Sequence, residues 1–124
     1  MFTTSCFIRK CTPELKSKLE DIGYHRRPIK EKYDKHKFLL VYRDGCYNSC
    51  TGNETGIEKY IDCGDNEEMF LAIAALRDDS NEHQWYTDGA RWCLHNMEPK
   101  YDWMIDDSWH KATVDELIEH FKNI

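Results

Sequence analysis

The run "MFLAIAAL" at residues 69–76 constrains the fold of this chain most, because it is apolar at every position. Eight residues are far fewer than the roughly 18 needed to cross a membrane. Either Asp65 or Asn66 can cap a helix just before the run. The apolar residues would cover a broad face of such a helix: Met69, Phe70, Ile73, Ala74 and Leu76. We therefore predict a helix at about 66–77 that is central to the fold.

Two further helices are predicted at about 13–22 and 114–122. Thr12 is a suitable N-cap, and the proline that follows it needs no amide donor at the first helical position. Thr113 and Glu116 have the spacing of a capping box, in which each side chain accepts a hydrogen bond from an otherwise unpaired amide. Both segments carry one apolar stripe at helical spacing: Leu15, Leu19 and Ile22 in the first, Val114, Leu117, Ile118 and Phe121 in the second.

Short apolar or alternating segments bounded by turn residues predict strands. They lie at about 5–10, 37–43, 46–51, 58–63, 84–96 and 101–109. Asp44-Gly45 is typical of a two-residue hairpin turn, and Asp88-Gly89 indicates a second hairpin. Residues 24–37 have no clean period and are expected to form a loop or an irregular edge. The prediction is an α+β fold, a single domain over 1–124 with an antiparallel sheet of five or six strands and three helices.

Composition places the chain among folded proteins, with 40% hydrophobic, 13% aromatic and 32% charged residues. The first residues lack the pattern of a signal peptide, so a cytoplasmic location with reduced thiols is expected. The net charge of −6 is unevenly distributed: residues 1–43 hold 11 Lys and Arg against 5 Asp and Glu, and residues 44–124 hold 6 against 18. The two parts either form surfaces of opposite charge or pack together so that their fields cancel, and we favour the second interpretation.

The six cysteines are unevenly spaced, at positions 6, 11, 46, 50, 63 and 93. Cys46 and Cys50 have the spacing of one half of a zinc site, and the candidates for the other half are Cys6 with Cys11 or Cys93 with His95. Neither of these second pairs forms a compact zinc knuckle. The alternatives are a disulfide framework or reduced thiols that pack as small hydrophobic residues, and the last is favoured. We therefore expect no metal and no cofactor.

Residues 24–37 are basic, with two tyrosines interleaved, which is a pattern found in polyanion-binding surfaces. The candidate polyanion-binding residues are Arg26, Arg27, Lys30, Lys32, Lys35 and Lys37. The chain as a whole is acidic, with a pI near 5.5, so nucleic-acid binding is the less favoured interpretation.

Aromatic residues gather in the C-terminal half, and Trp and Tyr are common anchors at protein interfaces. The candidate partner-binding residues are Trp85, Tyr86, Asp88, Trp92 and Trp103. Most of these rings are expected in the core, with one ring of the Trp85-Tyr86 pair off the core side because neighbouring strand residues face opposite ways.

Catalytic sequence motifs are missing. The chain has no G-x-S-x-G elbow, P-loop or G-x-G-x-x-G turn, and no histidine pair at helical metal spacing. The adjacent carboxylates at 78–79 and 106–107 follow predicted element ends, where Asp is common for its turn chemistry.

Several segments together resemble a group of short bacterial and mobile-element proteins of unknown function: "SCFIRK", "TPEL", "YIDCG", "NEEMFLAIAALRDD", "QWYTDG" and "HKATVDELI". The chain departs from them mainly in its Cys-rich hairpin at 44–52. The resemblance implies a small α+β domain and brings no activity with it.

The resulting hypothesis is a non-catalytic cytosolic module that binds a protein partner through its aromatic, acidic C-terminal half. Two alternatives stay open. One is a small metal-dependent or hydrolytic enzyme, and the other is an accessory protein that binds nucleic acid or another polyanion.

Overall fold

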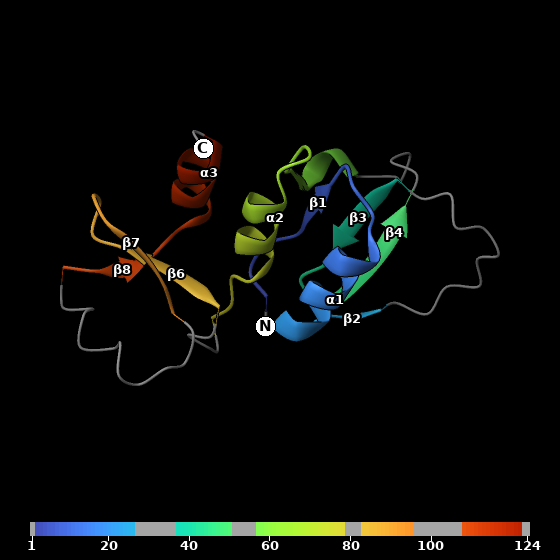
Figure 1. The fold of residues 1–124 in the computed structure, drawn as a ribbon, viewed down its shortest axis with the longest axis horizontal. Helices are drawn as coiled ribbons and strands as arrows, with labels where there is room; N and C mark the ends of the chain where they lie inside the picture. Colours follow the sequence, from blue (N-terminus) through green and yellow to red (C-terminus); the bar gives the residue numbers. More distant parts are fainter. Residues whose placement is uncertain (1, 27–36, 51–56, 79–82, 96–107, 123–124) are drawn as a thin grey trace.

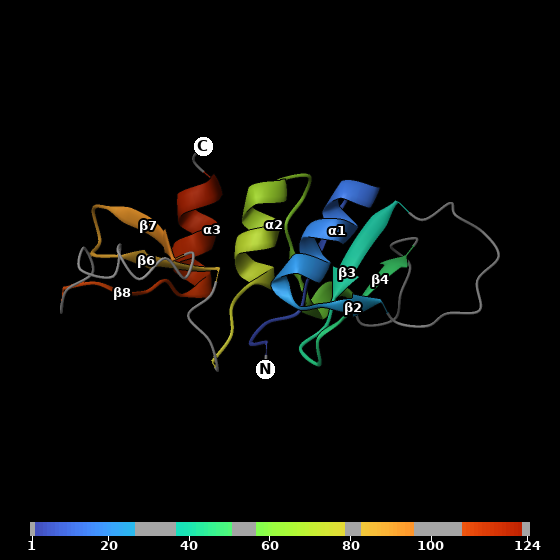
Figure 2. The same ribbon diagram turned by 60° about the horizontal axis from the view of Figure 1, so that its bottom comes forward.

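Helix α2 (Glu67–Ala74) lies between the two other helices, α1 (Pro13–Ile22) and α3 (Val114–Lys122). Figure 2 shows the three standing side by side, with α2 in the middle. The computed structural model describes residues 2–26, 37–50, 57–78, 83–95 and 108–122. The prediction of three helices with α2 at the centre is confirmed, although α2 ends about three residues earlier than predicted.

Each helix begins at the predicted cap. The Thr12 hydroxyl accepts a hydrogen bond from the Leu15 amide at 3.2 Å, and the Asn66 side chain accepts one from the Met69 amide at 3.0 Å. At α3 the Glu116 amide donates to the Thr113 hydroxyl at 3.3 Å, and the Thr113 amide donates to the Glu116 carboxylate at 3.0 Å. The capping box is therefore present as predicted.

A five-stranded sheet forms one end of the molecule (Figure 1). Its strands lie in the order β2 (His25–Arg26), β4 (Cys46–Cys50), β3 (Phe38–Val41), β1 (Cys6–Ile8) and β5 (Ile61–Asp62). The pairs β1–β3 and β3–β4 are antiparallel, whereas β1–β5 and β2–β4 are parallel. The prediction of a purely antiparallel sheet is therefore wrong. The parallel β1–β5 pair arises because two strand-then-helix units, β1–α1 and β5–α2, lie beside each other.

A separate three-stranded antiparallel sheet forms the other end. Its order is β7 (Trp92–His95), β6 (Gln84–Thr87) and β8 (His110–Lys111). The predicted hairpin around Asp88-Gly89 joins β6 and β7. The strand predicted at 101–109 falls largely outside the described residues, and β8 begins just after it. The strands thus divide between two sheets, because α2 and α3 lie between the two groups (Figure 1).

The hairpin between β3 and β4 has a longer connection than predicted. The Tyr42 amide donates to the Cys46 carbonyl, which leaves three residues between them, Arg43 to Gly45. Gly45 has a φ of +93°, which favours glycine at the last position of a three-residue loop. The Asp44 carboxylate accepts a hydrogen bond from the Cys46 amide at 3.1 Å, so the sequence "DGC" is explained by turn formation.

One main hydrophobic core runs through the molecule from the five-stranded sheet to α3. It includes side chains from every helix, among them Leu19, Phe70 and Leu117, each of which has no exposed surface. A smaller cluster on the other face of the five-stranded sheet contains Phe7 and Leu40. The guanidinium of Arg9 lies over this second cluster, 5.2 Å from the centre of the Phe38 ring.

Four groups from four different segments bind the carbonyls at the C-terminal end of α2. The Tyr24 hydroxyl donates to the Ala74 carbonyl at 2.7 Å, and the Gln84 amide group donates to the Ala75 carbonyl. The Thr3 amide then donates to the Leu76 carbonyl at 3.0 Å, and the Lys111 ammonium donates to the Arg77 carbonyl at 3.0 Å. We name this arrangement the α2 C-terminal junction. It ties the N-terminal segment, α1 and the three-stranded sheet to one helix end.

Candidate functional site

A groove of about 560 Å³ crosses the outer side of α2. Its floor consists of Glu68, Leu71, Ala72 and Ala75, which follow one another at i, i+3, i+4 and i+7 and therefore form one stripe of the helix. The other sides of α2 are already buried against β1, α1 and α3. An amphipathic helix would carry polar residues on its remaining side, yet this stripe is apolar at three of its four positions.

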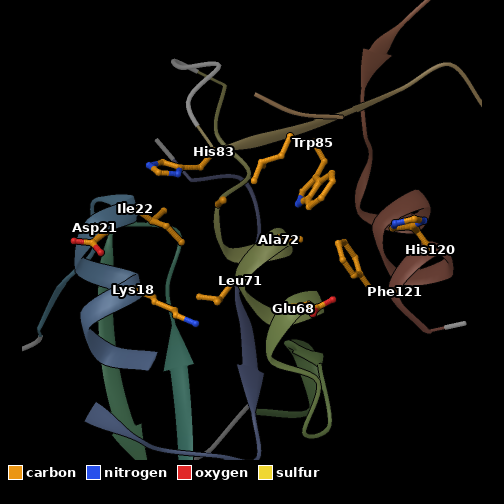
Figure 3. A pocket seen from close by; sticks show the side chains of 12 residues that line it. Lys18, Asp21, Ile22, Glu68, Leu71, Ala72, His83, Trp85, His120 and Phe121 are labelled. Atoms are coloured by element: carbon orange, nitrogen blue, oxygen red, sulfur yellow. The ribbon is translucent and has the colours of Figure 1, made fainter. Parts of the chain in front are cut away.

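The two sides of the groove are formed by different elements. Ile22 of α1 lines one side, and Trp85 of β6, Leu94 of β7 and Phe121 of α3 line the other. Figure 3 shows Lys18 and Ile22 of α1 on one side of α2 and Phe121 of α3 on the other, whereas Asp21 points away from the groove. Among the described residues, Leu94 is the only large hydrophobic residue that counts as exposed, at 36%. The groove therefore leaves apolar surface in contact with solvent.

Stacked rings make the second side rigid. The Trp92 and His120 rings lie 4.1 Å apart with an angle of 16° between their planes, and Trp85 meets Phe121 edge-on at 5.5 Å. Aromatic pairs of these kinds add to the stability that burial alone gives. The Trp85 side of the groove is consequently pre-formed.

Charged groups border the apolar surface. Lys18 and Asp21 lie on α1, and Glu68 lies at the start of α2. All three are exposed, and within the described part of the chain none of them takes part in an ion pair. His83 borders the groove beyond the C-terminal end of α2 (Figure 3). The charges of Lys18 and Glu68 are thus available to a molecule bound in the groove, whereas the Asp21 carboxylate points away from it (Figure 3).

The predicted partner-binding residues are partly brought together in this groove. Trp85 lines it, and Trp92 supports it through its stack with His120. Tyr86 is half-buried on the opposite face of β6, and Trp103 lies outside the described residues. The Asp88 carboxylate accepts hydrogen bonds from the Ala90 and Arg91 amides and from the Arg91 guanidinium, so it is engaged in its own turn.

The candidate zinc ligands are not brought together where the structure describes them. Cys46 lies on β4 in the five-stranded sheet, and Cys93 lies on β7 in the other sheet, at opposite ends of the molecule (Figure 1). The side chains of Cys50 and His95 lie outside the description. Within the described residues, no group of three or more His, Cys, Asp or Glu side chains is placed to hold a metal ion.

Basic and acidic residues are also distributed unevenly over the structure. The described residues of the five-stranded sheet, α1 and their connections (2–26, 37–50 and 57–63) hold eight Lys and Arg against six Asp and Glu. Those of the remaining part (64–78, 83–95 and 108–122) hold four against eight. This division differs from the one at residue 43, because β4 and β5 pair with β3 and β1, so the two parts of the sequence pack together. The interpretation that their fields cancel stays a prediction.

The candidate polyanion-binding residues fall at the basic end, but only two of them are described. Arg26 is exposed on the edge strand β2, and Lys37 is exposed just before β3. Arg27, Lys30, Lys32 and Lys35 lie outside the described residues.

Sequence patterns did not indicate the groove. The residues Leu71, Ala72 and Ala75 have the same apolar character as the core residues beside them, and nothing local shows that they border a groove. The only available signal was that α2 is apolar all round after its first turn, while the elements beside it are short.

Comparisons with known proteins gave no significant match to a protein family, to a curated protein or to a solved structure. The resemblance to short bacterial and mobile-element proteins therefore stays a prediction. Among the described residues, no helix has the length and apolar character required to span a membrane.

Proposed function

We propose that this protein is a non-catalytic interaction module of the cytosol that binds a segment of a partner protein in the groove across α2. The single observation that carries the proposal is the apolar stripe of α2 at the floor of an open groove. Leu71, Trp85 and Leu94 meet at this groove, and a mostly apolar hollow with a few polar groups at its border is a common form of binding site. Burying Leu94, Leu71 and the edge of Trp85 would supply the apolar contact that a partner needs.

Selection of peptides tests the proposal. A library of random peptides of about 15 residues, long enough to form a helix, is selected against the wild-type protein. The selected peptides are then measured against Ala72→Trp, which fills the groove, and against Ser17→Trp, which adds the same ring at an exposed position of α1 that does not line it. We expect binding to be lost with Ala72→Trp and kept with Ser17→Trp.

A second groove variant keeps the test decisive if Ala72→Trp misfolds. Leu94→Ala removes an exposed side chain and should leave the fold intact. If Leu94 anchors the interface, Leu94→Ala should weaken peptide binding by about 1–2 kcal/mol, which raises the Kd roughly five- to thirtyfold. Peptides whose affinity is unchanged by both groove variants would show that the groove is not the binding site.

The spatial separation of charge favours a second candidate function, which is polyanion binding at the basic end. Its test is titration with heparin and with single-stranded DNA at several salt concentrations. Binding through phosphate or sulfate contacts would weaken steeply as salt rises, and Arg26→Glu with Lys37→Glu would abolish it. Failure to bind at low salt would dismiss this function.

A further inference from the structure

The five-stranded sheet carries apolar side chains on both of its faces. One face packs against α1 and α2 and belongs to the main core, to which β3 contributes Leu39 and Val41. The opposite face carries the second cluster, and no helix residue among those described belongs to it. A sheet with helices on one face only normally carries polar side chains on the other. We name the second cluster the aromatic face; its apolar residues are Phe7, Phe38, Leu40, Tyr42 and Tyr60.

The centre of the aromatic face is closed, and ring surface remains accessible around it. Phe7 and Leu40 lie opposite each other on β1 and β3 and are 5% and 1% exposed. Phe38, Tyr42 and Tyr60 are half-buried around them. The Phe38 ring stacks with Phe7 at 5.9 Å and 11°, and Tyr42 meets Tyr60 edge-on at 6.2 Å. These contacts hold the half-buried rings in fixed orientations.

The two aromatic pairs are separated along β3. Phe38 and Tyr42 are four residues apart on the same side of the strand, which is about 13 Å at about 3.3 Å per residue. A ligand that contacts both pairs must therefore be extended and must present a flat group at each end of this span.

Arg9 adds a planar cation to the aromatic face. Its guanidinium lies 5.2 Å from the centre of the Phe38 ring and 5.9 Å from that of Phe7. The Arg9 Nε and Nη2 atoms donate to the Asp62 carboxylate at 3.3 Å and 2.6 Å, and the Arg9 side chain remains 52% exposed. Unpaired bases stack on guanidinium planes as they do on aromatic rings. Asp62 therefore positions Arg9 as a third flat surface.

Exposed cations accompany the half-buried rings in the chain: Lys37 precedes Phe38, Arg43 follows Tyr42, and Lys59 precedes Tyr60. All three cations lie outside the strands, and none forms an ion pair within the described part of the chain. Proteins bind single-stranded nucleic acid with this combination, in which cations contact the phosphates and rings stack on the bases.

The net charge around the aromatic face is small. Residues 37–50 and 57–63 hold three Lys and Arg against three Asp and Glu, and Arg9 adds one cation. Attraction of phosphates by charge alone is therefore weak here. Stacking of bases on the rings must supply most of the affinity, which distinguishes this surface from a general polyanion site.

We infer that the aromatic face binds single-stranded nucleic acid, with bases stacked on Phe38, Tyr60 and the Arg9 guanidinium. The phosphates lie beside Lys37 and Lys59. This inference goes beyond the proposed function and does not depend on it, because part of the groove wall belongs to the three-stranded sheet at the other end of the molecule (Figure 1). It also goes beyond polyanion binding, because it requires the bases.

The test compares strands with and without bases on the full-length wild-type chain. The labelled probes are oligothymidylate, oligouridylate and an abasic strand, each of about 12 nucleotides. The three carry the same phosphate charge. We expect at least one of the two base-bearing strands to bind about tenfold or more tightly than the abasic strand by fluorescence anisotropy at equal salt.

Aromatic variants locate the stacking. Phe38→Leu and Tyr60→Leu replace a ring with an aliphatic side chain, and each should weaken binding of the base-bearing strand about fivefold or more. Tyr86→Leu makes the same kind of change at a half-buried position of β6, in the other sheet, and should leave binding unchanged.

Charge variants locate the phosphates. Lys37→Gln with Lys59→Gln should weaken binding about threefold or more at low salt. Lys18→Gln with Lys122→Gln removes the same charge from exposed positions of α1 and α3 and should preserve binding. Equal weakening in both double variants would overturn the placement of the phosphates.

A measurement on the wild-type chain keeps the test decisive if an aromatic variant misfolds. Saturation with oligothymidylate or oligouridylate should shift the NMR amide signals of β1 and β3. Shifts confined to β6 and β7 would overturn the inference. Leu94→Ala should bind the strand as the wild type does, so the groove and the aromatic face fail or stand separately.

Other occupants give different results. Equal affinity for abasic and base-bearing strands would reduce the surface to a polyanion site and overturn the inference. No binding at about 50 mM salt would also overturn it. If the wild-type protein sediments as a dimer that Tyr60→Leu converts to a monomer, the aromatic face is covered by a second copy and the inference fails.

Discussion

Gln84 is a buried polar residue whose side chain completes the end of a distant helix. Its amide group donates to the Ala75 carbonyl, and its side-chain oxygen accepts from the Arg77 amide at 3.4 Å. Only 1% of the residue is exposed, so water cannot replace these partners. Glutamine in a strand pattern carries no sign of this role, because the partners lie in another element.

Substitution of Gln84 measures what this contact contributes. Gln84→Leu keeps the approximate volume but leaves a buried carbonyl without a donor, and we expect the free energy of unfolding to fall by about 1–3 kcal/mol. Tyr24→Phe removes the neighbouring donor at Ala74 and should cost about 0.5–1.5 kcal/mol. Urea denaturation measures the free energy of unfolding of both variants. An unchanged midpoint in Gln84→Leu would contradict the role of the side chain.

The Asp88 carboxyl should titrate far below the ordinary range. Hydrogen bonds from the Arg91 and Ala90 amides, together with the Arg91 guanidinium, lower the pKa of Asp88 to about 2. Because the pKa in the unfolded chain is near 3.9, the ionised carboxylate stabilises the turn fully above about pH 4, and this contribution is lost as pH falls through about 2. The amide resonances of Ala90 and Arg91 followed by NMR between about pH 1 and 6 should show that midpoint. A midpoint near 4 would refute it, and Asp88→Asn should abolish the transition.

At the scale of elements, the start of α3 depends on its capping box. The hydrogen bond from the Thr113 amide lowers the pKa of Glu116, and the His110 ring nearby at 2.8 Å contributes in the same direction. Phe121, in the last turn of the same helix, packs edge-on against Trp85 and lines the groove.

Thr113→Ala should destabilise the protein by about 1 kcal/mol, because the Glu116 amide loses its acceptor. Thr113→Ser retains the hydroxyl and should remain close to wild type. Denaturant midpoints of the two variants provide the comparison. Equal stability of Thr113→Ala and Thr113→Ser would mean that the cap contributes little.

Local patterns predicted the helices well because caps and apolar stripes are set by neighbouring residues. Thr12, Asn66 and Thr113 all act as their spacing indicated. The direction and grouping of the strands depend instead on contacts between distant segments, so the parallel β1–β5 pair and the division into two sheets were not visible. The groove was missed for a related reason, since Trp85 could be recognised as an anchor but the open side of α2 could not.

At the scale of the whole molecule, the two sheets should unfold together. One core and the α2 C-terminal junction connect them, so neither retains its partners without the other. All four tryptophans follow residue 84, so their fluorescence reports the C-terminal half. We expect its urea midpoint to coincide with loss of the native NMR amide signals of β1 and β3. An earlier fluorescence transition would show that the halves are separate folding units.

Thiol reactivity should follow the same architecture. Cys6 and Cys63 are buried in the core. Burial raises the pKa of the Cys6 thiol, and its hydrogen bond with Cys63 raises that pKa further. Alkylation requires the thiolate, so both should react with iodoacetamide only as fast as the protein unfolds. The half-buried Cys11, Cys46 and Cys93 should react sooner, as peptide mapping by mass spectrometry would show. Rapid alkylation of Cys6 in the native state would contradict this arrangement.

The α2 C-terminal junction has a consequence for biosynthesis. The ribosome makes α2 well before Gln84, Lys111 and α3, and at about 5–20 residues per second the delay amounts to some seconds. During that interval the Ala75 carbonyl lacks the Gln84 side-chain donor, and the Arg77 carbonyl lacks the Lys111 ammonium. The side of α2 that will meet α3 is also uncovered. The nascent chain therefore exposes part of the apolar surface of α2 until α3 emerges, and a chaperone that binds apolar segments could bind it during that interval.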